Sequence, residues 1–328
     1  MSRRFLLAAV ALCTSVAGCA NEDRVGGARE NGTGDALAPA SCRGTLTADN
    51  PVRLHKGVRA LAAGDGALFA ANPRAGTVTR VNTESGGAAR PYRAGRTPVS
   101  LTLAGDQLWA ADRDGDVALR LDPGTGRVEQ RIDVETPMAI GFAGGELSVM
   151  SLDDGAVYFF DQSGRKLADI QLPVIAPSHM QQLGGDMWVL GAGDMSIFVA
   201  NTRFKRAGGS GARIICTAAT DLAAGAGALW VADPVDRAVL RIEPSRLSMT
   251  VYQAPRPLAP AHVVVSDCGV WAADSKGRIG LFDPEALRWT GGPLEVGRSS
   301  GDLTADGAAV WVSDPVAGSV RRVAPAAP

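Results

Sequence analysis

Gly227–Asp233 reads GALWVAD, and variants of this stretch recur throughout the chain. When the copies are aligned on the tryptophan, seven anchor residues follow one another at steps of 40, 39, 40, 42, 41 and 40 residues: Phe69, Trp109, Ser148, Trp188, Trp230, Trp271 and Trp311. Self-similarity at a period of about 40 residues is typical of repeat architectures. The sequence therefore predicts seven copies of one structural unit.

Each copy has the same order of elements. An apolar strand and a Gly-containing turn precede the anchor stretch, and a turn that usually begins with Asp or Asn, a third strand and a weaker fourth strand follow it. Four short antiparallel strands per repeat, without helical periodicity, predict an all-β, seven-bladed β-propeller with the tryptophans packed between blades. The seventh repeat stops after three strands at Val323. We expect the N-terminal stretch Pro51–Leu54 to complete that blade, because closing the ring removes an exposed edge.

The N-terminus has the features of an export signal. Arg3 and Arg4 precede an apolar run, Phe5–Leu12, which is too short to cross a bilayer as a helix. Val16–Cys19 (VAGC) resembles a bacterial lipobox. The resemblance implies that residues 1–18 are a removable signal peptide and that Cys19 carries the acyl chains of a lipid anchor, palmitate among them. The alternative is an ordinary secretory signal that is cut nearby.

A polar, Gly-rich segment follows the cysteine. Residues 19–41 contain almost no large apolar side chains, so they are expected to form a flexible tether. We expect residues 42–328 to form a single propeller domain. The net charge of the chain is -1 and no basic block is present, which argues against a nucleic-acid partner. We expect a monomer.

The residue nine positions before each anchor begins the innermost strand of its blade. We call it the rim position, because the starts of the innermost strands surround the mouth of the central channel. Its occupants are Ala60, Ser100, Ala139, His179, Asp221, His262 and Asp302. Four successive blades therefore bring His, Asp, His and Asp to one half of the rim, while Ser100 lies on the other half.

This arc has two interpretations. In the first, it forms a ligand or divalent-metal site, with the histidines as ligands or bases and the aspartates as their carboxylate partners. In the second, the channel is wet and neighbouring His and Asp side chains simply pair. The third histidine, His55, is expected on the surface. The aspartates that follow the tryptophan stretches are expected to stabilise turns.

The folded part contains three cysteines, which permit one disulfide in an exported protein: Cys42, Cys216 and Cys268. Cys268 lies in the turn after the first strand of the sixth repeat. Cys216 ends the outer strand of the fourth repeat on the opposite face, too far away to bridge. Because Cys42 enters from the same side as Cys268, we predict a Cys42–Cys268 disulfide.

The segments that follow two of the anchors, Ala118–Val128 (ALRLDPGTGRV) and Val239–Pro244 (VLRIEP), carry a family resemblance. With GALWVAD they resemble the seven-bladed streptogramin (virginiamycin B) lyase-like propellers, and they are similar to NHL and YVTN repeats, over roughly residues 50–324. Those lyases use Mg²⁺, two histidines and a glutamate from adjacent late blades for an elimination. His262 is suitably placed for such a role. The next blade, however, brings Ser300 and Asp302 where a glutamate and a second histidine would be expected.

These patterns leave several functions open. The leading expectation is a membrane-anchored, extracytoplasmic lipoprotein of the bacterial cell envelope that binds a protein, peptide or glycan and performs no catalysis. The alternative is a metal-assisted lyase or lactone hydrolase, with a divalent metal at the channel mouth. A third possibility is a purely structural assembly factor. The sequence contains no phosphate-binding loop and no HExxH, CxxC or GxSxG motif.

Overall fold

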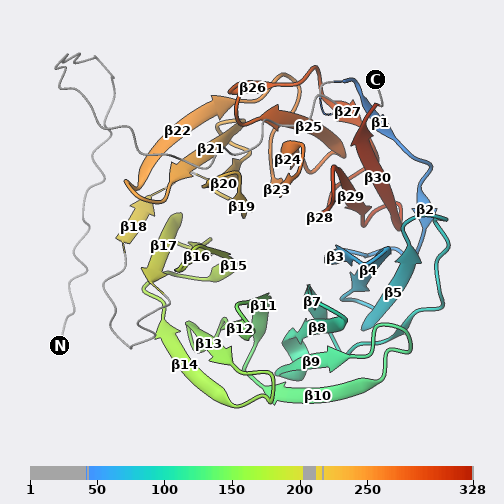
Figure 1. Cartoon of the computed structure of the whole chain (residues 1–328), viewed down its shortest axis with the longest axis vertical. Helices are drawn as coiled ribbons and strands as arrows, with labels where there is room; N and C mark the ends of the chain where they lie inside the picture. Colours follow the sequence, from blue (N-terminus) through green and yellow to red (C-terminus); the bar gives the residue numbers. More distant parts are fainter. Residues whose placement is uncertain (1–41, 43, 202–211, 216–217, 327–328) are drawn as a thin grey trace, which may run out of the picture. The chain divides into compact units, whose positions relative to one another are not determined.

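Antiparallel sheets are arranged in a ring around a central channel in the computed structural model, which describes residue 42 and residues 44–201, 212–215 and 218–326 (Figure 1). The described strands form seven sheets, which confirms the predicted seven-bladed propeller. The predicted signal peptide, Cys19, the whole of the predicted tether and Cys216 lie outside the described residues.

Each blade runs from an innermost strand at the channel to an outermost strand at the periphery. The first four blades consist of β3 (Leu61–Gly64), β4 (Ala67–Asn72), β5 (Thr77–Asn82) and β6 (Tyr92–Arg93); β7 (Pro98–Ala104), β8 (Gln107–Asp112), β9 (Val117–Leu121) and β10 (Val128–Asp133); β11 (Pro137–Ala143), β12 (Glu146–Ser151), β13 (Ala156–Phe160) and β14 (Lys166–Gln171); and β15 (Pro177–Leu183), β16 (Asp186–Gly191), β17 (Ser196–Asn201) and β18 (Ala212–Ile215).

The last three blades follow the same plan. They consist of β19 (Asp221–Gly225), β20 (Ala228–Asp233), β21 (Ala238–Glu243) and β22 (Ser248–Gln253); β23 (His262–Ser266), β24 (Gly269–Ala273), β25 (Arg278–Asp283), β26 (Arg288–Trp289) and β27 (Leu294–Glu295); and β28 (Leu303–Asp306), β29 (Ala309–Asp314) and β30 (Ser319–Pro325) with β1 (Leu46–Ala48) and β2 (Val52–Arg53).

The seventh blade is closed by the N-terminal part of the chain, as predicted, but in two pieces. Val52 pairs with Val320 in β30, and Leu46–Ala48 pairs with the end of the same strand. In Figure 1, β1 and β2 lie along β30 at the periphery. The pairing is interrupted at Pro51, which has no N–H to donate to the ladder. The predicted stretch thus supplies only half of the closing edge.

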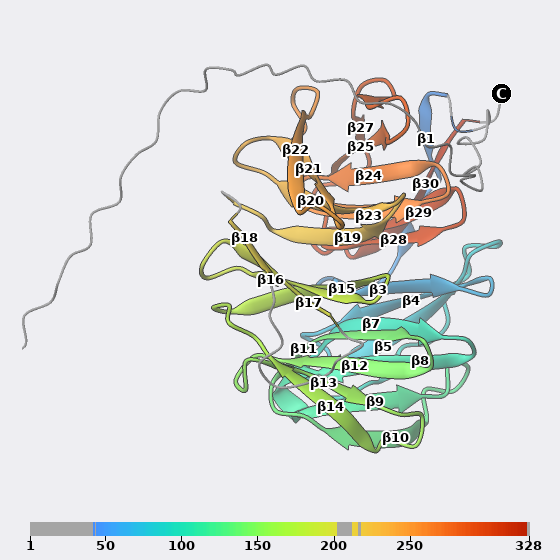
Figure 2. The ribbon, with the colours of Figure 1, turned by 60° about the vertical axis from the view of Figure 1, so that its left-hand side comes forward.

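The anchor side chains fill the space between neighbouring sheets, which lie face to face in Figure 2. All five anchor tryptophans are buried. Trp188 packs with Leu222 and Leu229 of the next blade, and Trp271 packs with Val310 of the seventh blade. The predicted core role of the tryptophans is therefore confirmed.

Aspartates fix the turns that follow the anchor strands. Asp314 accepts hydrogen bonds from the N–H groups of Arg298, Val316 and Ala317. Asp112 similarly accepts the N–H groups of the loop that enters its blade. These bonds tie each turn to its neighbourhood, which is the structural role that the sequence indicated. His55 is exposed, also as expected.

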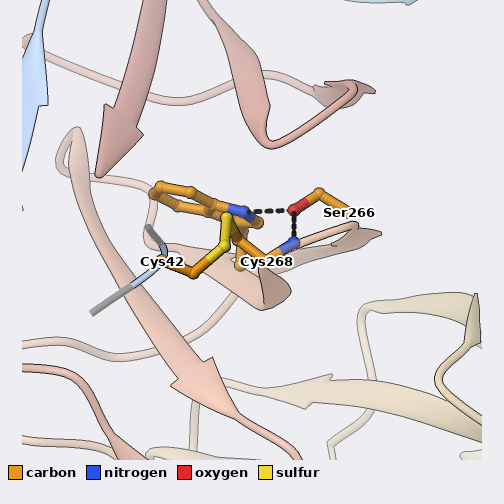
Figure 3. Close-up of a disulfide and its surroundings, with 4 residues drawn as sticks. Cys42, Ser266 and Cys268 are labelled. Carbon is orange, nitrogen blue, oxygen red and sulfur yellow. Dashed lines mark hydrogen bonds between the residues drawn. A yellow bond between two sulfur atoms is a disulfide. The ribbon is translucent and has the colours of Figure 1, made fainter. Parts of the chain in front are cut away.

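Cys42 and Cys268 form a disulfide with their Cα atoms 5.3 Å apart (Figure 3). Ser266 Oγ accepts hydrogen bonds from the Cys268 N–H, at 3.0 Å, and from the Trp271 indole, at 2.9 Å. Cys268 lies in the turn between β23 and β24, at the opposite end of β23 from His262. The described chain therefore joins the propeller on the face opposite the mouth. We call this the lower face, and the face that carries the mouth the upper face.

Candidate functional site at the channel mouth

The innermost strands present backbone N–H groups to the channel. Each innermost strand is hydrogen-bonded on one edge only, so alternate N–H groups on its other edge face the channel. In the first blade, Ala71 exchanges backbone bonds with Arg59 and Ala60, and this register leaves the N–H of Leu61 facing inward. The apolar residue after each rim position is the equivalent of Leu61.

Rim-position side chains satisfy several of these inward N–H groups, and they do so across blade boundaries. Asp302 accepts the N–H of Leu61 at 2.7 Å, which joins the seventh blade to the first. Asp221 accepts the N–H of Val263 at 3.0 Å, which joins the fifth blade to the sixth. On the other half of the rim, Ser100 Oγ accepts the N–H of Ile140 at 3.3 Å. The rim side chains therefore stabilise the ring as well as lining its mouth.

Asp221 lies at the centre of the His/Asp arc. Its Oδ1 atom is 3.7 Å from His179 Nε2, and its Oδ2 atom is 3.7 Å from His262 Nδ1. Asp221 also accepts the N–H of Leu222 at 2.8 Å, so both of its oxygens are already engaged with the backbone. The structure thus brings His179, Asp221 and His262 together. The described contacts of Asp302 are instead to the backbone N–H groups of its own and the first blade.

Burial and mutual charge shift the pKa values of this cluster. Burial acts to raise the pKa of Asp221, but the neighbouring His179 and His262 outweigh it and hold that pKa below its ordinary value. Burial acts to lower the pKa of His262, but contact with Asp221, and then the charge of Asp302, raises it. Burial and repulsion from Asp221 raise the pKa of Asp302 to about 7. The arc therefore changes its charge near neutral pH.

The mouth opens into a cavity of about 440 Å³. The five rim residues predicted to bind a ligand all line it: Ser100, His179, Asp221, His262 and Asp302. Arg59, Ser178, Gln181 and Thr304 add polar groups that the sequence reasoning missed. Ser178 Oγ lies 3.1 Å from His179 Nδ1. Pro177 is the sequence feature that could have indicated Ser178. The register of β15 against β16 shifts between Pro177 and His179, and this shift places Ser178 at the mouth.

The donor set does not fit a metal centre in this arrangement. The two histidines face the two oxygens of one carboxylate rather than converging on a common point. Among the described residues, no group of three or more His, Cys, Asp and Glu side chains is placed to hold a metal ion. The geometry instead gives a hydrogen-bonded, charge-coupled cluster at the entrance of a polar cavity.

Solved structures with the same architecture include enzymes. A streptogramin B lyase superimposes with a TM-score of 0.72 at 14% identity, over 88% of this chain and 100% of the other. A catalytically inactive virginiamycin B lyase from Staphylococcus aureus, solved with quinupristin, gives 0.70 at 15% identity, over 86% and 99%. The hydrazine synthase of Kuenenia stuttgartiensis gives 0.71 at 13% identity, over 84% and 97%.

No protein-family model matches the sequence, and no curated protein sequence matches it either. The structural likenesses define the class of fold: this chain shares the seven-bladed β-propeller architecture of the streptogramin lyases and the hydrazine synthase. At these identities the likeness shows the fold alone.

Proposed function

We propose that this chain is a membrane-anchored, extracytoplasmic propeller lipoprotein whose upper face binds another molecule of the cell envelope without transforming it. The observation that carries the proposal is the engagement of the rim carboxylates. Asp221 and Asp302 accept backbone N–H groups from two blades each, so they hold the walls of the cavity in place. A rigid, polar cavity with fixed walls suits recognition.

Anchoring through Cys19 is the second part of the proposal. The described residues form no helix long and apolar enough to cross a membrane. The Cys42–Cys268 disulfide is typical of an oxidising compartment outside the cytoplasm. A Cys19→Ser variant should move from the membrane fraction to the soluble fraction and should fail to incorporate a labelled fatty acid. Unchanged membrane retention of this variant would contradict anchoring at Cys19.

Binding on the upper face can be tested with the full chain, crosslinked in cells and recovered from detergent extracts. A His179→Ala/His262→Ala variant removes the two imidazoles of the mouth. A matched lower-face control, Asp65→Ala/Asp106→Ala, changes two turns at the other end of the innermost strands. We expect the control to recover the same partners as the wild type and the mouth variant to lose at least one of them. Equal recovery by all three proteins would place the binding surface elsewhere.

A metal-assisted lyase or lactone hydrolase remains the second candidate. It is favoured by the carboxyl of Asp302, whose pKa is raised to about 7 beside His262 in a cavity, since perturbed groups of this kind gather at functional sites. For metal binding, the histidines would have to turn away from Asp221. Elemental analysis, thermal stability with added Mg²⁺, Mn²⁺ or Zn²⁺, and cleavage of quinupristin test it. Stoichiometric metal with turnover would favour this candidate over the binding function.

A further inference from the structure

The upper face carries an exposed apolar patch on the fourth and fifth blades. Its large members are Ile175, Met195 and Val235, which are 65%, 50% and 71% exposed. The loops that hold the first two are joined, because the Gly193 N–H donates to the Ile175 carbonyl at 2.9 Å. Val235 lies in the equivalent turn of the next blade, between β20 and β21. We call these three residues the upper patch.

The exposed apolar turns of the fourth and fifth blades have one counterpart in the seventh blade, where Val316 is 49% exposed. In the first three blades the equivalent turns expose charged residues, namely Arg74, Asp114 and Asp153. The loop before β15, Leu172–Ala176, contains no charged residue at all. Exposed apolar residues on a binding face are typical of a contact with another molecule.

The upper patch is continuous with the channel mouth. Ile175 is followed directly by Ala176, Pro177, Ser178 and His179, and the last two line the cavity. The side chain of His179 is 44% exposed and lies 3.7 Å from Asp221. The upper patch is therefore separated by only a few residues of chain from a side chain that lies beside Asp221.

The charged groups at the channel mouth indicate which kind of ligand would bind there. Two carboxylates, Asp221 and Asp302, and two imidazoles line the cavity, and among the described residues the one lysine or arginine that lines it is Arg59 of the first blade. A cationic side chain that enters from the fourth and fifth blades meets Asp221 first. Apolar contacts beside an acidic pocket suit a peptide segment with a basic residue between apolar ones.

We infer that the upper patch and the channel mouth together bind a peptide segment of a partner protein, with apolar side chains on Ile175, Met195 and Val235 and one lysine or arginine side chain in the mouth. This inference rests on the proposed binding function and names its ligand class. A bilayer is the less favoured occupant, because anionic headgroups would face Asp221 and Asp302. In addition, the chain joins the propeller at Cys42 on the lower face, which is the face opposite the upper patch.

The test uses labelled peptides and the full chain in detergent. The probes are acetyl-Leu-Lys-Leu-Leu-amide and the same peptide with norleucine or glutamate in place of lysine. We expect the lysine peptide to bind at least tenfold more tightly than the other two at pH 8. Affinity should fall several-fold at pH 6, because the pKa of Asp302 is about 7 and that of His262 is raised, so protonation makes the mouth less negative.

Two substitutions at equivalent turns provide a matched pair. Val235→Asp lies in the upper patch, whereas Val316→Asp lies in the same Asp-Pro-Val turn of the seventh blade. Both replace an exposed side chain and should leave folding intact. We expect Val235→Asp to weaken binding of the lysine peptide at least fivefold and Val316→Asp to leave it within twofold.

Three results would overturn the inference: no binding of the lysine peptide, equal binding of the lysine and norleucine peptides, or equal effects of the two substitutions. Binding to vesicles of anionic phospholipid that Val235→Asp abolishes, without peptide binding, would assign the patch to a membrane instead. If the peptides fail while the crosslinked partners are still lost in the His179→Ala/His262→Ala variant, the ligand class is wrong and the proposed binding function stands.

Discussion

The late blades and the early blades share one repeat but differ in their polar contacts. In blades five to seven the rim position holds Asp221, His262 and Asp302, and both carboxylates bond to the following blade. In blades one to three the same position holds Ala60, Ser100 and Ala139. Of these three, only Ser100 carries a side-chain acceptor for an inward N–H group.

The anchor tryptophans show the same division. Trp230, Trp271 and Trp311 each donate their indole N–H to an acceptor five residues earlier in the chain. The indole nitrogens of Trp109 and Trp188, in contrast, are buried without a hydrogen-bond partner within the described structure. A buried anchor tryptophan therefore does not need an indole hydrogen bond, and the indole bonds that do form lie in blades five to seven, next to the closing junction.

The largest expected effect concerns the disulfide of the sixth blade. Replacing both Cys42 and Cys268 with serine should lower the free energy of unfolding by about 2–5 kcal/mol, because the bridge closes a long loop in the unfolded chain. Chemical denaturation of the variant and of the wild type, with and without reductant, measures it. If reductant destabilises the double serine variant as much as the wild type, the bridge is not the cause.

The second comparison sets one rim position against another. Asp302→Ala removes the acceptor of the Leu61 and Leu303 N–H groups and should destabilise the protein by about 1–3 kcal/mol at pH 7. Ser100→Ala removes one longer bond, to Ile140, and should have an effect of about 0.5–1 kcal/mol. Denaturant unfolding gives both values. Equal values would show that the two halves of the rim contribute alike.

The third prediction is a pH dependence confined to the late blades. Because the pKa of Asp302 is raised to about 7, the folded state binds a proton that the unfolded state releases, so stability falls as pH rises through 7. The raised pKa of His262 acts in the same direction. From pH 6 to pH 8 we expect a loss of about 1.4 kcal/mol from Asp302, which corresponds to one pKa unit. Thermal unfolding of an Asp302→Asn control should show a flatter profile, and an identical slope would assign the dependence to other groups.

The smallest effect concerns the indole donors. Trp230→Phe loses the hydrogen bond to the Gly225 carbonyl, whereas Trp188→Phe removes a donor that has no acceptor among the described residues. Both variants lose similar apolar area, so Trp230→Phe should be the more destabilising by about 1 kcal/mol. Parallel urea titrations test this difference, and the reverse order would contradict it.

The fold could be predicted from the sequence because large buried side chains mark the repeat. The tryptophans recur at a nearly constant step, and the rim position could be counted back from them to the cluster around Asp221. The function of the rim side chains was harder to predict. Whether a carboxylate at the rim is free or accepts a backbone N–H depends on the register of the innermost strand, and no residue pattern encodes the direction of an N–H group.

Two other features also escaped prediction for physical reasons. The closing edge divides at Pro51, and its first piece, Leu46–Ala48, is too short to show strand periodicity. The upper patch is made of single apolar residues in separate turns, so it becomes visible only when the blades are placed side by side.

The joint in the seventh blade has a consequence for the order of events in biosynthesis. Thr47 and Ala324 are neighbours in one sheet although 277 residues separate them in the chain. The ring therefore cannot be completed until the last strand has been synthesised, and long-range pairing of this kind is slow to form. Until then β30 has an open edge, to which strands of other chains can add. A chain that stops before Val323 would keep its repeats, yet it would lose the pairing of β30 with Leu46–Ala48.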